Sequence, residues 1–539
     1  MSILNKVFSK IRSSLYVFKK AEIMQNIVNK EINGEYDNLC HKCYFNERYH
    51  QHAKLQGILQ TDNKLSISIY LGGALGDYIV YLRFVDEISS ICECNVDLFT
   101  DRIEFANYVY GQRKNVTIIH DAHNCLFNTS FKEYDLAVHL DHGLTLKHCN
   151  LGDIREKSPD FYVTACKIVE YSQSNKINIE KQHERESVIL RRAKFLGENK
   201  WSKLSCNGAI DMSEKYSNIV INPDDLSVLD RYNIKDVSYI TVNYGADKNM
   251  GGTAQTKVLP LETIEKLINK FKQTYPEILV VQTGLKNSLQ ITGADRYAFD
   301  CKLGETAVIL KNSICHVDSE GGLVHMSAQM STPCVVSFGP TPVYYYGYER
   351  NINIVSPACS DCMATTPQWS KVCSRGMQVP VCMKAITPDM LLDGIKSIIE
   401  KLHVSKNWDN IKQYNELDIN KLSNECEHNV ISNSKKICII SNLDTNIISK
   451  IKELKKTGKK VEVFIPLDLD DNIVSLRTEL KKMDVIVEYG TSLNIARISS
   501  NFDTIICKND DVIENNKLYA KKELLRIIEE NGVIVWLKQ

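Results

Sequence analysis

The chain has no surplus of charge, because its 66 lysines and arginines are matched by 66 aspartates and glutamates. Proteins that bind nucleic acid generally carry a basic excess that pairs with phosphates, so we expect no nucleic-acid partner. The chain also lacks an apolar run near the ~20 residues that cross a bilayer, and its first segment lacks the apolar core and cleavage site of a signal peptide. These absences predict a cytoplasmic protein.

Basic residues interrupt the apolar residues of that first segment, MSILNKVFSKIRSSLYVFKK. The spacing is typical of an amphipathic helix, which either packs on the protein or lies on an anionic membrane surface. Peripheral contact with the inner face of the membrane is therefore one of two interpretations. The sequence leaves association into a homo-oligomer equally open.

Short apolar segments alternate with helical patterns along most of the chain, which predicts parallel α/β sheets. Two such series follow each other and predict two Rossmann-like domains that face a cleft. A third series has SNLDTN after its first strand in place of a G-x-G-x-x-G phosphate loop, so we interpret it as an accessory Rossmann-like domain. The segments expected as strands include 96–99, 116–119, 238–243, 278–282 and 334–338.

The expected division of the chain follows from these series. It comprises a helical and polar N-terminal extension (1–64), two Rossmann-like domains (65–235 and 236–402), a polar linker (403–436) and the C-terminal accessory α/β domain (437–539).

A glycine-rich turn, GGALGD, separates the first expected strand from a helix and contains Gly73, Ala74, Gly76 and Asp77. Glycines let the backbone approach a ligand closely, and the start of a helix attracts anions. Asp77 follows the carboxyl end of a strand, where α/β proteins bind their ligands. Its carboxylate could serve as a general base, although an Asp at this position also commonly caps its own helix.

The second series contains two further motifs. Asn243 and Gly245 follow a strand, and Lys257 precedes a proline and a helix, where its ammonium could neutralise a diphosphate or simply face solvent. Farther on, in DSEGGLVH, consecutive glycines open a helix and expose backbone N–H groups to phosphate oxygens. We favour a ligand role for His325 in that helix over a buried structural one, because it adjoins the glycine pair and two acids. The candidate donor-binding residues of this motif are Asp318, Ser319, Gly321, Gly322 and His325.

Four of the 18 cysteines, Cys359, Cys362, Cys373 and Cys382, form a C-x2-C-x10-C-x8-C pattern in an irregular segment. Four thiolates with one C-x-x-C pair suit tetrahedral zinc or a single iron, although chance clustering is the alternative. We expect a structural zinc or iron here, because four protein ligands leave no open coordination position. Most of the other cysteines fit the free thiols of a reducing compartment.

Taken in order, the three glycine and lysine motifs resemble those of glycosyltransferase family 9, the ADP-heptose heptosyltransferases, over residues 66–400. GGALGDYIV is similar to the acceptor-side motif of that family, TKVLP to its lysine motif, and VDSEGGLVHMSAQMSTPCVVSFGPT to its donor motif. The branch of the family that modifies autotransporters is similar in using an iron-binding finger of cysteines.

The resemblance implies a GT-B fold, in which Asp77 is the catalytic base and Lys257 stabilises the phosphates. Diphosphate and sugar contacts then fall on the donor-motif residues named above. The chain departs from the family in the donor motif, where Glu320 and one additional residue intervene before His325. Leu259 replaces an aromatic residue, and Lys286 and Asn287 stand where an acid usually holds the donor ribose.

The expected function is metal-independent, inverting transfer of a sugar, heptose from ADP-heptose, to a hydroxyl of a glycan or protein acceptor in a bacterial cell. The alternatives are the same fold acting on another nucleotide sugar, and a catalytically inactive scaffold for assembly.

Overall fold

The computed structural model describes residues 64–121, 124–174, 182–245, 256–402, 411–417, 433–466, 473–496, 502–508 and 516–537. The expected N-terminal extension, apart from residue 64, and most of the expected linker lie outside these residues. The chain divides into two compact units, Met1–Gly73 with Phe84–Lys176 and Leu204–Asp211, and Ala74–Arg83 with Ile177–Lys203 and Met212–Gln539. No helix of the described residues is long and apolar enough to cross a membrane.

The first unit contains a five-stranded sheet of order β3-β2-β1-β4-β5. Its first four strands are parallel, and β5 runs antiparallel to β4 at the edge. The central strand β1 is buried along most of its length, as expected of a parallel strand covered on both faces. The strands are β1 Leu65–Leu71, β2 Cys94–Thr100, β3 Val116–His120, β4 Leu136–Leu140 and β5 Leu144–Cys149, and the helices are α4 Ile103–Tyr110, α5 Cys125–Ser130, α6 Leu151–Lys157 and α7 Pro159–Ser174. Helix α3 (Leu75–Ile91) continues from β1 and is shared between the two units.

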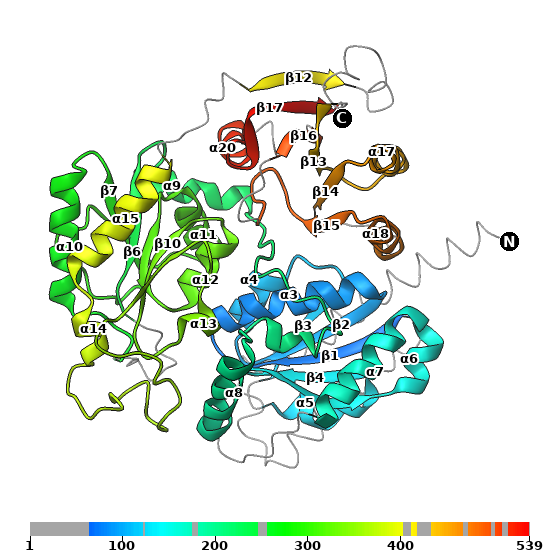
Figure 1. Ribbon diagram of the computed structural model, residues 1–539, viewed down its shortest axis with the longest axis horizontal. Helices are drawn as coiled ribbons and strands as arrows, with labels where there is room; N and C mark the ends of the chain where they lie inside the picture. Colours follow the sequence, from blue (N-terminus) through cyan, green and yellow to red (C-terminus); the bar gives the residue numbers. More distant parts are fainter. Residues whose placement is uncertain are drawn as a thin grey trace, which may run out of the picture. The chain divides into compact units, whose positions relative to one another are not determined.

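A six-stranded parallel sheet of order β11-β10-β9-β6-β7-β8 forms one part of the second unit. Helices α10 and α15 lie side by side along it (Figure 1). The helical spacing of Ile264, Leu267, Ile268 and Phe271 turns one stripe of α10 into the core. The strands are β6 Tyr239–Asn243, β7 Leu279–Gly284, β8 Arg296–Phe299, β9 His316–Ser319, β10 Cys334–Phe338 and β11 Ile352–Val355.

The helices associated with this sheet are α8 Gln182–Leu196, α9 Val228–Arg231, α10 Leu261–Thr274, α11 Leu303–Asn312, α12 Gly322–Gln329, α13 Val343–Tyr346, α14 Val381–Ala385 and α15 Pro388–Leu402. The strand order reverses between β6 and β9, so the carboxyl ends of these two strands form the topological switch point at which α/β sheets bind ligands.

The second unit also contains a six-stranded parallel sheet of order β12-β17-β16-β13-β14-β15, drawn from yellow to red in Figure 1. Two separate hydrophobic clusters bury its residues. The strands are β12 Lys412–Leu417, β13 Lys436–Ile440, β14 Lys460–Ile465, β15 Ile486–Tyr489, β16 Phe502–Lys508 and β17 Ile528–Leu537, and the helices are α17 Thr445–Lys456, α18 Ile473–Lys482 and α20 Lys517–Ile527. We call it the third sheet.

One strand of the third sheet, β12, lies within the segment expected as a linker. It pairs in parallel with β17 and occupies the edge of the sheet. Its sequence, KQYNEL, is polar because an edge strand faces solvent on one side, and polarity hides such a strand from a hydrophobic pattern.

Candidate functional site

Two glycine turns that are far apart in the sequence pack directly against each other within the second unit. A Cβ on Gly76 would lie 2.5 Å from Cδ2 of His325, and one on Gly322 would lie 3.2 Å from Cβ of Leu75. Neither position has room for a side chain without displacement of its neighbour. The start of α3, with Asp77, therefore lies against the start of α12.

Asp77 engages both of its carboxylate oxygens. Oδ2 accepts a hydrogen bond from the backbone N–H of Ala74 at 2.8 Å, so the residue does cap its own helix. Oδ1 forms an ion pair with Nζ of Lys200. The ammonium of Lys200 also lies 5.2 Å from the ring centroid of Tyr346 and 5.9 Å from that of Tyr81, and the lysine side chain is only 4% exposed. A buried cation of this kind favours the ionised form of the carboxylate beside it.

Lys257, Glu320 and His325 form a second polar cluster beside the glycine pair. Nζ of Lys257 donates to Oε2 of Glu320 at 2.5 Å, and Nε2 of His325 lies 3.6 Å from Oε1 of the same carboxylate. Burial alone would raise the pKa of Glu320, but the charge of Lys257 and the contact with His325 hold it well below its ordinary value. Glu320 therefore stays ionised throughout the physiological range and neutralises the lysine.

His325 is 3% exposed and is fixed by aromatic residues. Its Nδ1 lies 2.9 Å from the hydroxyl of Tyr348. The ring centroid of Trp201 lies 6.0 Å from that of His325 and 5.0 Å from that of Tyr348. The ligand role and the buried structural role that were expected as alternatives are therefore compatible, because Nε2 remains directed toward Glu320.

The switch point of the sheet brings Asn243 and Asp318 together. Nδ2 of Asn243 donates to both carboxylate oxygens of Asp318, at 3.1 and 3.2 Å, and the backbone N–H of Ser319 donates to Oδ1 at 2.7 Å. Behind them, Nε2 of His316 lies 3.4 Å from Oδ2. These contacts fix the ends of β6 and β9 at the place where a ligand would bind.

Two of the glycines predicted for the site occupy the left-handed backbone region, where a side chain would be strained. Gly73 has φ 99° and Gly245 has φ 121°. Residues 246–255, which follow Gly245, lie outside the described residues. Gly321 has an extended backbone with φ 179°, so its value to the site is the absence of a capping side chain at the start of α12.

Sequence reasoning missed Lys200, Trp201 and Tyr348. Tyr346 lies in a run of three tyrosines, 344–346, which could line a ligand site but which core packing explains equally well. Glu320 was visible as an additional residue in the donor motif, but its ion pair with Lys257 depends on a contact between distant segments. No pattern within a short stretch of sequence could have shown these pairings.

The four clustered cysteines share one region. Cys382 is buried, and the other three are half-buried. Burial raises the pKa of Cys382 to about 11, and Cys359, Cys362 and Cys373 are close enough to add to this rise. Among the described residues, no group of three or more His, Cys, Asp or Glu side chains is arranged to hold a metal ion. The donor set suits a soft metal in its chemistry, and the structural metal stays a prediction.

No protein-family profile matches this chain, and no curated protein matches it in sequence. Among solved structures, the chain is similar to a family 9 glycosyltransferase from Veillonella parvula (15% identity, 63% of this chain and 98% of that one, TM-score 0.42). It is also similar to ADP-heptose lipopolysaccharide heptosyltransferase II of E. coli (12%, 63% and 100%, TM-score 0.40). A third similar structure is the iron-containing dodecameric glycosyltransferase TibC of enterotoxigenic E. coli (12%, 64% and 79%, TM-score 0.40).

Proposed function

We propose that this protein is a glycosyltransferase that moves a sugar from a nucleotide-sugar donor to an acceptor hydroxyl with inversion. The observation that carries the proposal is the contact between the two glycine turns, Gly76 against His325. It joins a carboxylate suited to act as a base with a cation and an uncapped helix start suited to hold a diphosphate.

On the acceptor side, Asp77 removes the proton of the attacking hydroxyl. The acceptor oxygen then forms a bond to the anomeric carbon while the bond from that carbon to the phosphate oxygen breaks, which inverts the configuration. Lys200 keeps the carboxylate ionised before the reaction. The hydrogen bond from Ala74 leaves the second carboxylate oxygen fixed in orientation.

On the donor side, the leaving nucleoside diphosphate gains negative charge as its bond to the sugar breaks. Lys257, His325 and the free N–H groups at the start of α12 stabilise that charge. Glu320 already holds Lys257, so the diphosphate must compete with this carboxylate for the ammonium. The structure therefore represents a charge-neutralised resting arrangement in this proposal.

The motif resemblance supports ADP-heptose as the donor, with a glycan or protein hydroxyl as the acceptor. We further propose the GT-B plan, a structural zinc or iron at the four cysteines with no metal needed for catalysis, and a cytoplasmic location with optional contact to the inner face of the membrane. Self-association into a homo-oligomer completes the proposal.

The first experiment measures nucleotide release from ADP-heptose and, separately, from other ADP-, UDP- and GDP-sugars. Asp77→Asn is measured beside the wild-type protein. Asp444→Asn is the matched control, because Asp444 also caps a helix, α17, but lies in the third sheet. Release from ADP-heptose that only Asp77→Asn abolishes supports the proposal.

The other outcomes are equally informative. Release from a different sugar nucleotide alone replaces the donor and keeps the reaction. If no donor is turned over and calorimetry detects no nucleotide binding, the transferase proposal is wrong and the scaffold alternative takes its place.

A further inference from the structure

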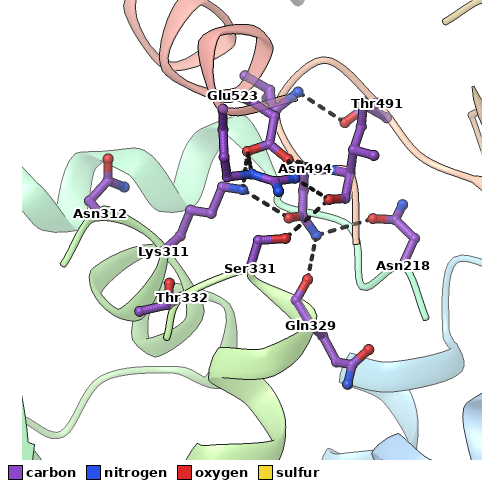
Figure 2. A network of polar contacts seen from close by, with 12 residues as sticks. Asn218, Lys311, Asn312, Gln329, Ser331, Thr332, Thr491, Asn494 and Glu523 are labelled. Carbon is purple, nitrogen blue, oxygen red and sulfur yellow. Dashed lines mark hydrogen bonds and ion pairs between the residues drawn. The ribbon is translucent and has the colours of Figure 1, made fainter. Parts of the chain in front are cut away.

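The buried side-chain amide of Asn494, which belongs to the third sheet's part of the chain, contacts three segments of the part that contains strands β6 to β11. Asn494 lies in the turn after β15 and is fully buried. Its Nδ2 donates to the side chain of Asn218 at 3.1 Å, to the carbonyl oxygen of Ile219 at 3.0 Å and to that of Gln329 at 3.2 Å, and its Oδ1 accepts from Nζ of Lys311 at 3.0 Å. Figure 2 shows this amide at the centre of the polar network. If the amide were turned by 180°, its Oδ1 would face the acceptor oxygens of Asn218, Ile219 and Gln329 in place of Nδ2. These partners therefore specify one orientation of the amide.

A buried carboxylate secures the same turn. Oε2 of Glu523 accepts from Nζ of Lys311 at 2.6 Å, while its Oε1 accepts from the backbone N–H of Ile495 at 2.6 Å. Arg526 donates to both oxygens of Glu523, and the hydroxyl of Ser331 donates to the carbonyl oxygen of Ile495 at 3.1 Å. The turn is therefore held by charged and neutral hydrogen bonds that are buried or largely buried, which makes its position specific.

The partner of Asn494 at the end of α12 leads back to the candidate site. Gln329 is the last residue of the helix that begins at Gly322, and its Nε2 donates to the hydroxyl of Tyr348 at 3.3 Å. Tyr348 in turn lies 2.9 Å from Nδ1 of His325. A continuous chain of buried polar contacts thus runs from the third sheet to the histidine beside the glycine pair.

The same contacts fix the ring of His325 from both sides. Its Nδ1 lies 2.9 Å from the hydroxyl of Tyr348, which also accepts from Gln329, and its Nε2 faces the carboxylate of Glu320. A shift of Gln329 would loosen Tyr348 and, with it, the orientation of the imidazole, because the partner of one ring nitrogen sets how the other nitrogen is presented.

We propose that the third sheet positions the donor-binding helix: Asn494 is a positioning residue that holds Gln329 and, through Tyr348, the orientation of His325. This inference rests on the function proposed above for the site. It gives the third sheet a role in nucleotide binding without a ligand-binding loop of its own.

The test compares Asn494→Ala with Asn312→Ala. Asn312 lies beside Lys311 on α11 (Figure 2), but its side chain donates to the carbonyl oxygen of Val308 within the same helix. Two quantities are measured on the full-length protein: hydrogen exchange of residues 322–329, and the affinity for ADP. We expect Asn494→Ala to speed exchange in α12 and to weaken ADP binding by about tenfold, the scale of the one hydrogen bond that Asn494 makes to α12, while Asn312→Ala matches the wild type.

The two measurements separate failure of the inference from failure of the proposed function. Unchanged exchange in α12, or faster exchange with unchanged ADP affinity, overturns the positioning role. If the wild-type protein binds no ADP, the proposed donor is wrong, and the exchange comparison alone decides whether Asn494 holds α12. Should Asn494→Ala fail to fold, Ser331→Ala removes a single contact to the same turn and is expected to give a smaller change in the same direction.

Discussion

The two six-stranded sheets of the second unit share a parallel strand order around β6 and β13 but differ in the chemistry at their strand ends. Strand β6 lies between β7 and β9, and strand β13 lies between β14 and β16. After β9, helix α12 begins with glycines and no capping side chain. After β13, Asp444 accepts hydrogen bonds from the backbone N–H groups of Asn446 and Ile447 at the start of α17.

The difference explains why the start of α12 is expected to bind a phosphate and the start of α17 is not. The N–H groups at the start of α12 remain available to a ligand, whereas two of those at the start of α17 are already bound to a carboxylate that would also repel an anion. A common topology therefore does not confer a common function, because the loops at the strand ends carry the chemistry.

The largest expected effect concerns stability and belongs to the third sheet. Glu523 has a pKa of about 2 in the folded protein, because Arg526 and Lys311 outweigh the effect of burial, which alone would raise it. The ionised carboxylate of Glu523 makes its full contribution to the free energy of unfolding above about pH 4.5, the ordinary pKa of a glutamate. That contribution is lost as the pH falls toward 2. We expect acidification over this range to lower the free energy of unfolding by about 3 kcal/mol, measured by denaturant titration at several pH values.

Glu523→Gln provides the control, since the variant should lose this acid-dependent component while keeping the rest of the profile. Lys311 gives a slope of the same sign at alkaline pH. Burial lowers its pKa to about 8, so between pH 8 and about 10.5 the folded chain binds fewer protons than the unfolded chain. Its contribution to stability should grow as the pH rises through that range, and a decrease there would contradict the assignment.

The second effect concerns the glycine contact of the candidate site. Gly76→Ala places a methyl group against the ring of His325, and we expect nucleotide release to fall by about a hundredfold, because small displacements at a reacting centre are costly. Gly458→Ala is the counterpart in the third sheet, where a left-handed backbone makes alanine strained but no neighbour lies within 4 Å. It should cost stability of about 1 kcal/mol and leave turnover unchanged. Equal turnover in the two variants would show that the contact between Gly76 and His325 is not needed for the reaction.

Local patterns predicted the strands well, and they failed where a feature depends on distant partners. The strand expected at 334–338 is confirmed as β10, and that expected at 96–99 lies within β2, because buried parallel strands are continuous apolar runs. The edge strand β12 was hidden by its polar sequence. Glycine pairs mark a turn at any position, but Lys200 and Asn494 acquire their roles only through residues more than a hundred positions away. A short stretch of sequence does not show contacts of this kind between distant segments.

A third effect tests whether Lys200 tunes the carboxylate of Asp77. Lys200→Met removes the buried cation, so the carboxylate should accept a proton more readily, and the acidic limb of the pH–rate profile should move to higher pH. Turnover near neutral pH should fall by about tenfold, within the range of a general-base contribution. Lys200→Arg keeps the charge and should restore the limb. In the third sheet, Lys459→Met also removes a buried lysine, and a shift of the limb in that variant would show that the effect is not specific to the site.

The smallest effect distinguishes competition from positioning at Glu320. If its carboxylate competes with a diphosphate for Lys257, Glu320→Gln should tighten ADP binding several-fold, because the amide keeps the shape and removes a negative charge beside the expected phosphates. The gain should persist from pH 8 down to pH 5, since the lowered pKa of Glu320 keeps the wild-type carboxylate ionised throughout this range. Weaker binding in the variant would mean that Glu320 chiefly positions Lys257 and His325. Calorimetric titration with ADP, with Glu462→Gln in the third sheet as the control, decides between the two roles and shows whether the charge at the start of α12 opposes or supports its proposed ligand.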